Sequence, residues 1–136
     1  MPSLACFVIV AAEGRKLRPL VWMGRSREDL KRFPDEVQDE MGYGLFAAQA
    51  GEKHPRAKPL KCFTGAGVLE MLSDHRGDTY RVVYTVRLTH AVYVLHAFQK
   101  KSKRGIGTPK RDVELIRQRL TLAEEADARF TSGARR

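Results

Sequence analysis

Residues 92–98, VYVLHAF, form an uninterrupted apolar run that is rich in β-branched and aromatic side chains. A strand that is apolar on both faces has to be covered on both sides, so it belongs in the interior of a sheet. The run then changes character abruptly, because four of the six residues after Phe98 are cationic: Lys100, Lys101, Lys103 and Arg104. We therefore expect a central strand whose end carries concentrated positive charge.

Helical patterns precede this run. A short apolar strand at 20–23 leads into SREDLKRF (26–33), where Ser26, with an acid three residues later, fits a capping box. Pro34 opens a second helix with an acidic first turn, and its apolar residues recur at helical spacing as far as Gly51, a typical C-terminal glycine. The pattern predicts a helical hairpin, and two glycines within its second helix, Gly42 and Gly44, predict close packing there.

Strand patterns follow a polar, proline-bounded loop at 52–59. After a short apolar strand at 60–63, residues 68–72 and 80–86 flank the polar turn SDHRGD, which predicts a β-hairpin. The strand at 92–98 comes next along the chain.

A last helix is expected after the glycines of GIGTP. Thr108 fits its N-cap and Pro109 its first helical position. Its buried stripe should consist of Val113, Ile116, Leu120 and Ala123. From about residue 126 the pattern weakens, and we expect the end of the chain to fray.

With the short 60–63 segment left aside, the element order is β-α-α-β-β-β-α. This order predicts a small α+β domain over residues 19–125, in which an antiparallel sheet with a mixed edge packs against the N-terminal helical hairpin and the C-terminal helix. Residues 1–18 are assigned to an N-terminal extension, either an extra strand or a disordered leader. Residues 126–136 are assigned to a C-terminal tail.

Positive charge is unevenly distributed along the 136 residues. The chain carries a net charge of +9, and residues 99–120 contribute +6 of it, whereas seven charges of each sign cancel within residues 20–59. Such a basic block predicts a polyanionic partner: nucleic acid, an anionic membrane surface or an acidic protein. No run approaches the roughly 20 apolar residues of a membrane span. Two cysteines without disulfide or zinc spacing indicate a reducing compartment, so we expect a cytoplasmic protein.

Three segments together resemble a known family. KPLKCF (58–63), GDTYRVVYTV (77–86) and VYVLHAFQKKSKRGIGTPKRD (92–112), behind a helical hairpin, are similar to the RelE/ParE toxin superfamily. The branch they resemble most is the HigB-type, phage-related toxins of type II toxin–antitoxin modules, and the similarity covers about residues 20–122.

The resemblance implies a RelE-like fold and a ribosome-dependent mRNA endonuclease that a helix-turn-helix antitoxin of the HigA/Xre type holds inactive. It implies neither a metal nor a small-molecule cofactor. The superfamily also contains ParE-like inhibitors of DNA gyrase, so the fold alone does not decide the target. A gyrase inhibitor and a plain nucleic-acid-binding module are therefore the alternatives.

RNA cleavage without a metal requires removal of the 2′-hydroxyl proton, cations at the phosphate and protonation of the leaving 5′-oxygen. By resemblance, Arg81 is the family's strand arginine, whose guanidinium offers a fork to two phosphate oxygens. Lys100 and Lys101 match its cations at the strand end, and the histidine of LHAF, His96, is a candidate proton shuttle. The structural alternatives are a salt bridge from Arg81 to Glu70 or Asp74, a solvated lysine run and a core histidine.

Further residues are assigned to RNA binding: Lys61, Lys103, Arg104, Lys110, His54 and Tyr84. His54 is a second candidate for acid–base chemistry, and a core position is the alternative for Tyr84. Two departures from the family leave the general base unassigned. Acidic residues, Glu70 and Asp74, stand where several relatives have lysines, and Lys58 stands where some relatives have a glutamate base. The four histidines show no metal-ligand spacing.

Overall fold

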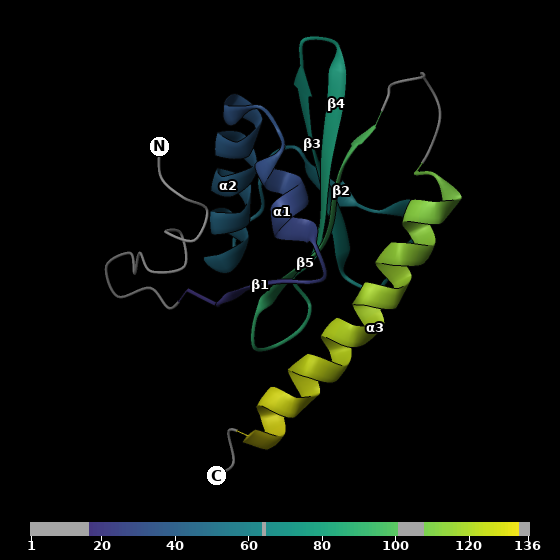
Figure 1. Cartoon of the computed structure of the whole chain (residues 1–136). Coiled ribbons are helices and arrows are strands. Elements are labelled where there is room, and N and C mark those ends of the chain that lie inside the picture. Colours follow the sequence, from purple (N-terminus) through teal and green to yellow (C-terminus); the bar gives the residue numbers. More distant parts are fainter. Residues whose placement is uncertain (1–16, 64, 101–107, 134–136) are drawn as a thin grey trace.

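The structure is a computed structural model that describes residues 17–63, 65–100 and 108–133 (Figure 1). Its elements are, in chain order, β1 (Leu20–Trp22), α1 (Ser26–Lys31), α2 (Asp35–Gln49), β2 (Ala57–Pro59), the 3₁₀ turn η2 (Lys61–Phe63), β3 (Val68–His75), β4 (Asp78–Thr85), β5 (Val92–Lys100) and α3 (Lys110–Gly133). The predicted α+β class is confirmed. Of the extension assigned to residues 1–18, all but the last two residues lie outside the described part of the chain.

Five strands form one sheet in the order β1-β5-β4-β3-β2. Strands β2, β3, β4 and β5 pair with one another in antiparallel fashion, whereas β1 runs parallel to β5 and provides the predicted mixed edge. The apolar strand β5 lies inside the sheet, as its two apolar faces require. Between β3 and β4 only Arg76 and Gly77 form the turn, and both have positive φ angles, 51° and 86°, as a two-residue hairpin turn of type I′ demands.

The helical hairpin covers one face of the sheet (Figure 1). Apolar side chains of this face form one core cluster, which includes Leu30, Phe33, Met41 and Leu45 from the helical segment and Val82, Tyr84 and Val94 from the strands. The hairpin approaches the sheet closely at Gly44, where a Cβ atom would overlap the side chain of Met71 on β3. The close packing predicted from this glycine is therefore confirmed.

Helix α3 crosses the opposite face of the sheet (Figure 1). Its predicted stripe is the side that it buries, because Ile116, Leu120 and Ala123 join a second core cluster with Val83, Tyr93 and Leu95, and Val113 packs against that cluster. None of the helices in the described ranges combines the length and hydropathy that a membrane crossing requires.

The segment after the helical hairpin differs from the prediction. Residues 60–63 do not form a strand, and the edge strand β2 lies three residues earlier, within the predicted loop. Leu60 and Phe63 are both buried in the α3-side core. Their spacing of three residues suits a 3₁₀ turn, in which side chains at i and i+3 lie on the same side. In the edge strand β2, Lys58 lies opposite Glu70 of β3.

Two hydroxyl groups predicted to cap helices bind the sheet instead. Ser26 is the first residue of α1, and its buried Oγ donates to the carbonyl oxygen of Val94 at 3.2 Å. Thr108 lies two residues before α3 begins at Lys110, and its Oγ1 accepts a hydrogen bond from Arg81. In both cases a partner distant in sequence replaces the local capping contact.

Helix α3 also continues through the segment predicted to fray and ends at Gly133. The buried carboxylate of Asp127 accepts hydrogen bonds from the backbone N–H groups of Thr89 and His90, at 3.1 and 2.9 Å. It also accepts one from the hydroxyl of Tyr93 at 3.1 Å. The Asp127 carboxylate thus holds the last turns of α3 beyond the predicted apolar stripe.

Candidate functional site

Arg81 of β4 points toward the α3 side of the sheet and is paired there. Its Nη1 donates to Oε1 of Glu70 at 2.8 Å and to Oγ1 of Thr108 at 3.2 Å. Both charged side chains are largely buried, with exposed fractions of 12% for Arg81 and 8% for Glu70. The other carboxylate oxygen of Glu70 lies 4.0 Å from Nζ of Lys58. The salt-bridge alternative for Arg81 is therefore present, and Glu70 lies between two cations.

His96 of β5 is held on two sides. Its Nε2 lies 2.8 Å from Oδ1 of Asp112 in the first turn of α3. Its ring stacks on Phe98, with the ring centroids 4.7 Å apart and the planes inclined by 18°. The other ring nitrogen, Nδ1, is buried and has no hydrogen-bond partner among the described residues.

Arg81 and His96 meet on one face of the sheet at the beginning of α3. Arg81 lies opposite Phe98 in the β4–β5 ladder, and Phe98 follows His96 by two residues, so the three side chains share a face. Thr108 and Asp112, four residues apart, each contact one of the two predicted catalytic residues. The prediction named Arg81 and His96, and Glu70 as an alternative partner of Arg81, but not the contacts with Thr108 and Asp112.

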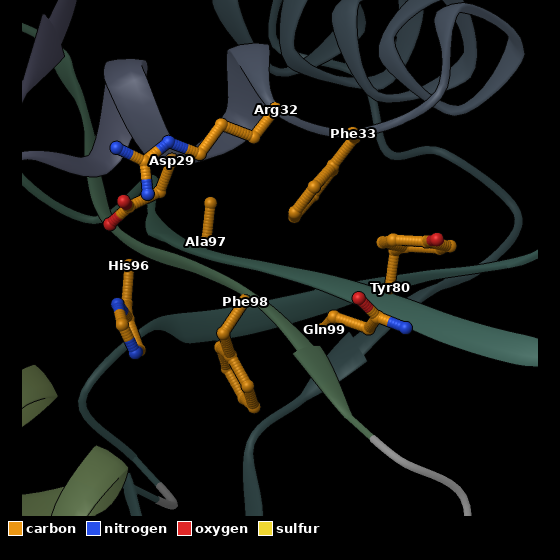
Figure 2. A pocket seen from close by; sticks show the side chains of 8 residues that line it. All are labelled: Asp29, Arg32, Phe33, Tyr80, His96, Ala97, Phe98 and Gln99. Atoms are coloured by element: carbon orange, nitrogen blue, oxygen red, sulfur yellow. The ribbon is translucent and has the colours of Figure 1, made fainter.

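An open hollow of about 350 Å³ lies beside β5 (Figure 2). Strand β1 pairs with β5 only at residues 92–94, and the hollow borders the following part of β5. Its wall consists of Asp29, Arg32, Phe33, Tyr80, His96, Ala97, Phe98 and Gln99. His96 therefore lies between the beginning of α3 and a space that is open to solvent.

Besides Arg81, three of the predicted cations lie within the described residues and three lie outside them. Lys100 ends β5, where its backbone pairs with Thr79. The residues Lys101, Lys103 and Arg104 are outside the described part of the chain. Lys61 of η2 and Lys110, the first residue of α3, are exposed.

Two residues predicted to bind RNA lie elsewhere. Tyr84 is completely buried in the core beneath the helical hairpin, and this burial raises its pKa to about 12. It has no free ring face for a base, so the core alternative is correct. His54 is buried beside Gly44 of α2, on the other side of the sheet from Arg81, and its Nδ1 accepts a hydrogen bond from the backbone of Arg56 at 3.0 Å.

Comparison with protein families identifies the chain. The family model of phage-derived, Gp49-like proteins (DUF891) matches residues 28–121, more than half of the sequence. The chain belongs to the Gp49-like family. This family is related to the RelE/HigB-like toxins of toxin–antitoxin modules. Comparison with curated proteins and with solved structures gave no match.

The region matched by the Gp49-like family contains both charged pairs of the site, Arg81–Glu70 and His96–Asp112. Asp112 was missed in the sequence, where its only signal is an acidic residue in the first turn of a helix, a common position for such residues. Among the described residues, no group of three or more potential metal ligands lies together.

Proposed function

We propose that this Gp49-like protein is the toxin of a type II toxin–antitoxin module and cleaves mRNA on the translating ribosome. The 2′-hydroxyl attacks the adjacent phosphate without a metal ion. The observation that carries the proposal is the meeting of a permanent cation, Arg81, with an imidazole, His96, on one face of the sheet. These two side chains supply charge stabilisation and proton transfer, which this reaction requires.

Arg81 is the phosphate-binding residue of the proposed site. In the free protein Nη1 is used by Glu70 and Thr108, while Nε has no partner among the described residues. A guanidinium group has five N–H donors, so Arg81 can bind a phosphate oxygen without giving up every present contact. Lys100 and Lys101 complete the cationic part of the site, and His96 transfers the proton.

The other basic residues predicted for RNA binding contact the RNA backbone and the ribosome: Lys61, Lys103, Arg104 and Lys110. The same basic surface binds an acidic face of the antitoxin, a helix-turn-helix protein, so that antitoxin and RNA compete for it. This function places the protein in the cytoplasm.

The test of the proposed function is to map mRNA ends in a translating extract with and without the purified protein. We expect new mRNA ends that depend on translation, and we expect Arg81→Ala to lower the cleavage rate about 100-fold or more, the effect typical of removing one group that stabilises the transition state. The matched control is Arg56→Ala, which removes an arginine from an exposed pair with Asp74 and should leave cleavage unchanged.

Production of the protein in cells without its antitoxin gives the second readout. Growth arrest with cleaved mRNA supports the proposal, and unchanged arrest and cleavage by Arg81→Ala would show that the site assignment is wrong. DNA damage with intact mRNA would identify a gyrase inhibitor instead. Tight RNA binding without toxicity would identify a plain nucleic-acid-binding module.

A further inference from the structure

The proposed reaction needs a base for the 2′-hydroxyl proton, and the described structure offers a specific atom for this role. His96 contacts Asp112 through Nε2, at 2.8 Å. With Asp112 ionised, its carboxylate can only accept hydrogen bonds, so Nε2 then carries the proton of this contact. A neutral imidazole has one N–H group, and Nδ1 is then the unprotonated nitrogen with a free lone pair.

The surroundings of Nδ1 differ from those of an ordinary core histidine. Buried polar atoms are nearly always hydrogen-bonded, yet Nδ1 has no partner among the described residues. His96 is also one of the residues that line the open hollow, although its ring lies on the other side of β5 from Asp29, Arg32 and Ala97 (Figure 2). Stacking on Phe98 and the contact with Asp112 fix the plane of the ring from the other directions. The ring is thus held while one acceptor atom is left unpaired.

Charged residues are present on each element packed around His96. Asp112 comes from α3, and Asp29 of α1 and the adjacent Arg32 line the same hollow. Arg81 lies across the ladder beside Phe98, with its charge paired to Glu70. Among these groups Asp112 is the one within hydrogen-bond distance of the imidazole.

We infer that Asp112 is a positioning residue that fixes the tautomer of His96, so that Nδ1 is the proton acceptor of RNA cleavage. The inference rests on the proposed function for its catalytic part. Nδ1 is buried in the free protein, so RNA binding has to expose it. It then takes the 2′-hydroxyl proton while the 2′-oxygen forms a bond to phosphorus and the P–O5′ bond breaks. The leaving 5′-oxygen takes a proton from water, and the imidazolium later returns its proton to solvent. The products are a 2′,3′-cyclic phosphate and a 5′-hydroxyl.

The tautomer is measured in the free protein, without RNA, by ¹⁵N NMR of the histidine rings. We expect the Nε2–H tautomer for His96 in the native protein at neutral pH and a mixture of tautomers in Asp112→Ala. The matched control is Glu114→Gln, which removes a carboxylate from the same helical turn region but is exposed and should leave the His96 tautomer unchanged. An Nδ1–H tautomer in the native protein, or no change in Asp112→Ala, would overturn the inference.

Cleavage by Asp112→Asn is the second measurement, because this variant keeps the size of the side chain and removes its charge. We expect the cleavage rate to fall about 100-fold, the lower end of the range for losing acid–base assistance. RNA affinity should be unchanged, and Asp112→Glu should restore part of the rate. A native cleavage rate in Asp112→Asn would overturn the catalytic part.

The two measurements separate this inference from the proposed function. If the native protein cleaves no RNA, the proposed function and the catalytic part of the inference both fail, while the NMR result still decides whether Asp112 sets the tautomer. If the protein cleaves RNA and Arg81→Ala abolishes cleavage, but Asp112→Asn does not reduce it, the catalytic part of the inference fails while the proposed function stands.

Discussion

The Arg81–Glu70 pair lies where water cannot compensate either charge, so each residue depends on the other. Glu70→Ala would leave a largely buried guanidinium with Thr108 as its remaining partner among the described residues. We expect this change to lower the free energy of unfolding by about 3–5 kcal/mol, as is typical when one member of a buried pair is removed. Arg81→Ala should cost less, because Glu70 keeps Lys58 at 4.0 Å. Urea unfolding of both variants measures the difference.

The control for this prediction is Asp74→Ala at the next carboxylate of β3. Its pair with Arg56 is exposed, with 46% of the Arg56 and 64% of the Asp74 side chain accessible, and such pairs contribute about 1 kcal/mol or less. The double variant Glu70→Ala/Arg81→Ala should be more stable than the sum of its single changes implies. A Glu70→Ala variant as stable as Asp74→Ala would contradict the prediction.

At this scale the sequence predicted the need for a partner but not its identity. An arginine within an apolar strand requires an acid or a ligand, and Glu70 and Asp74 were equally available. The ladder decides between them, because Asp74 lies opposite Thr79 and its carboxylate is bound by Thr79 and Arg56. The hydrogen bond from Thr79, followed by that from Arg56, lowers the pKa of Asp74. Glu70 is left for Arg81.

At the scale of elements, a buried carboxylate anchors the last turns of α3. Asp127 accepts hydrogen bonds from Thr89, His90 and Tyr93, which together fix the loop between β4 and β5. The buried surroundings, and to a smaller extent Asp127, raise the pKa of Tyr93 to about 12, so the hydroxyl stays protonated and donates. We expect Asp127→Ala to lower the free energy of unfolding by about 3 kcal/mol, since buried donors lose a charged acceptor.

Hydrogen exchange locates this effect. Amides of residues 89–93 and of the end of α3 should exchange faster in Asp127→Ala. The exchange rates of amides in β3 and β4 should change only as far as the loss of global stability requires. The matched control is Glu125→Ala, an exposed acid on the same helix, which should change stability by less than about 0.5 kcal/mol. Equal effects of the two changes would contradict an anchoring role for Asp127.

Long elements could be predicted because each repeats its period over several residues. The apolar run of β5 and the buried stripe of α3 are such repeats, and the structure contains the strand and the buried helix face that they predict. Short elements could not, because three residues such as β2 carry no period, and the neighbouring 60–63 segment is more apolar. Cap positions failed for a different reason: the hydroxyls of Ser26 and Thr108 have tertiary partners that no local pattern indicates.

At the scale of the whole molecule, the net charge of +9 overstates the charge available to a partner. Arg119 is built into the fold, since its Nη1 donates to the carbonyl oxygen of Leu95 at 2.9 Å. Its guanidinium also fills the space beside Gly24, where a Cβ atom would lie 2.6 Å away. Burial lowers the pKa of Arg119, although Asp29 opposes this effect. Arg117 lies over the ring of Phe63, with the guanidinium carbon 5.0 Å from the ring centroid.

The sequence therefore located the basic region but could not separate cations that stabilise the fold from cations that face a partner. Within the first turns of α3, Lys110 and Arg111 are exposed and adjoin the candidate site. Arg129 is also exposed but lies toward the other end of the same helix, which extends away from the end of β5 (Figure 1). Arg111 and Arg129 are thus exposed arginines of the same helix, one beside the candidate site and one far from it, and can be compared directly.

This comparison gives a prediction for RNA binding. Each phosphate neutralised on a single strand releases counterions and contributes about −0.7 to the slope of log affinity against log salt. With about four such contacts, affinity for a single-stranded oligoribonucleotide should fall about 50-fold between 50 and 200 mM KCl. Arg111→Gln should make the slope shallower by about 0.7, whereas Arg129→Gln should leave it unchanged. Fluorescence anisotropy titrations at several salt concentrations measure both slopes, and equal slopes for the two variants would show that RNA does not bind at the beginning of α3.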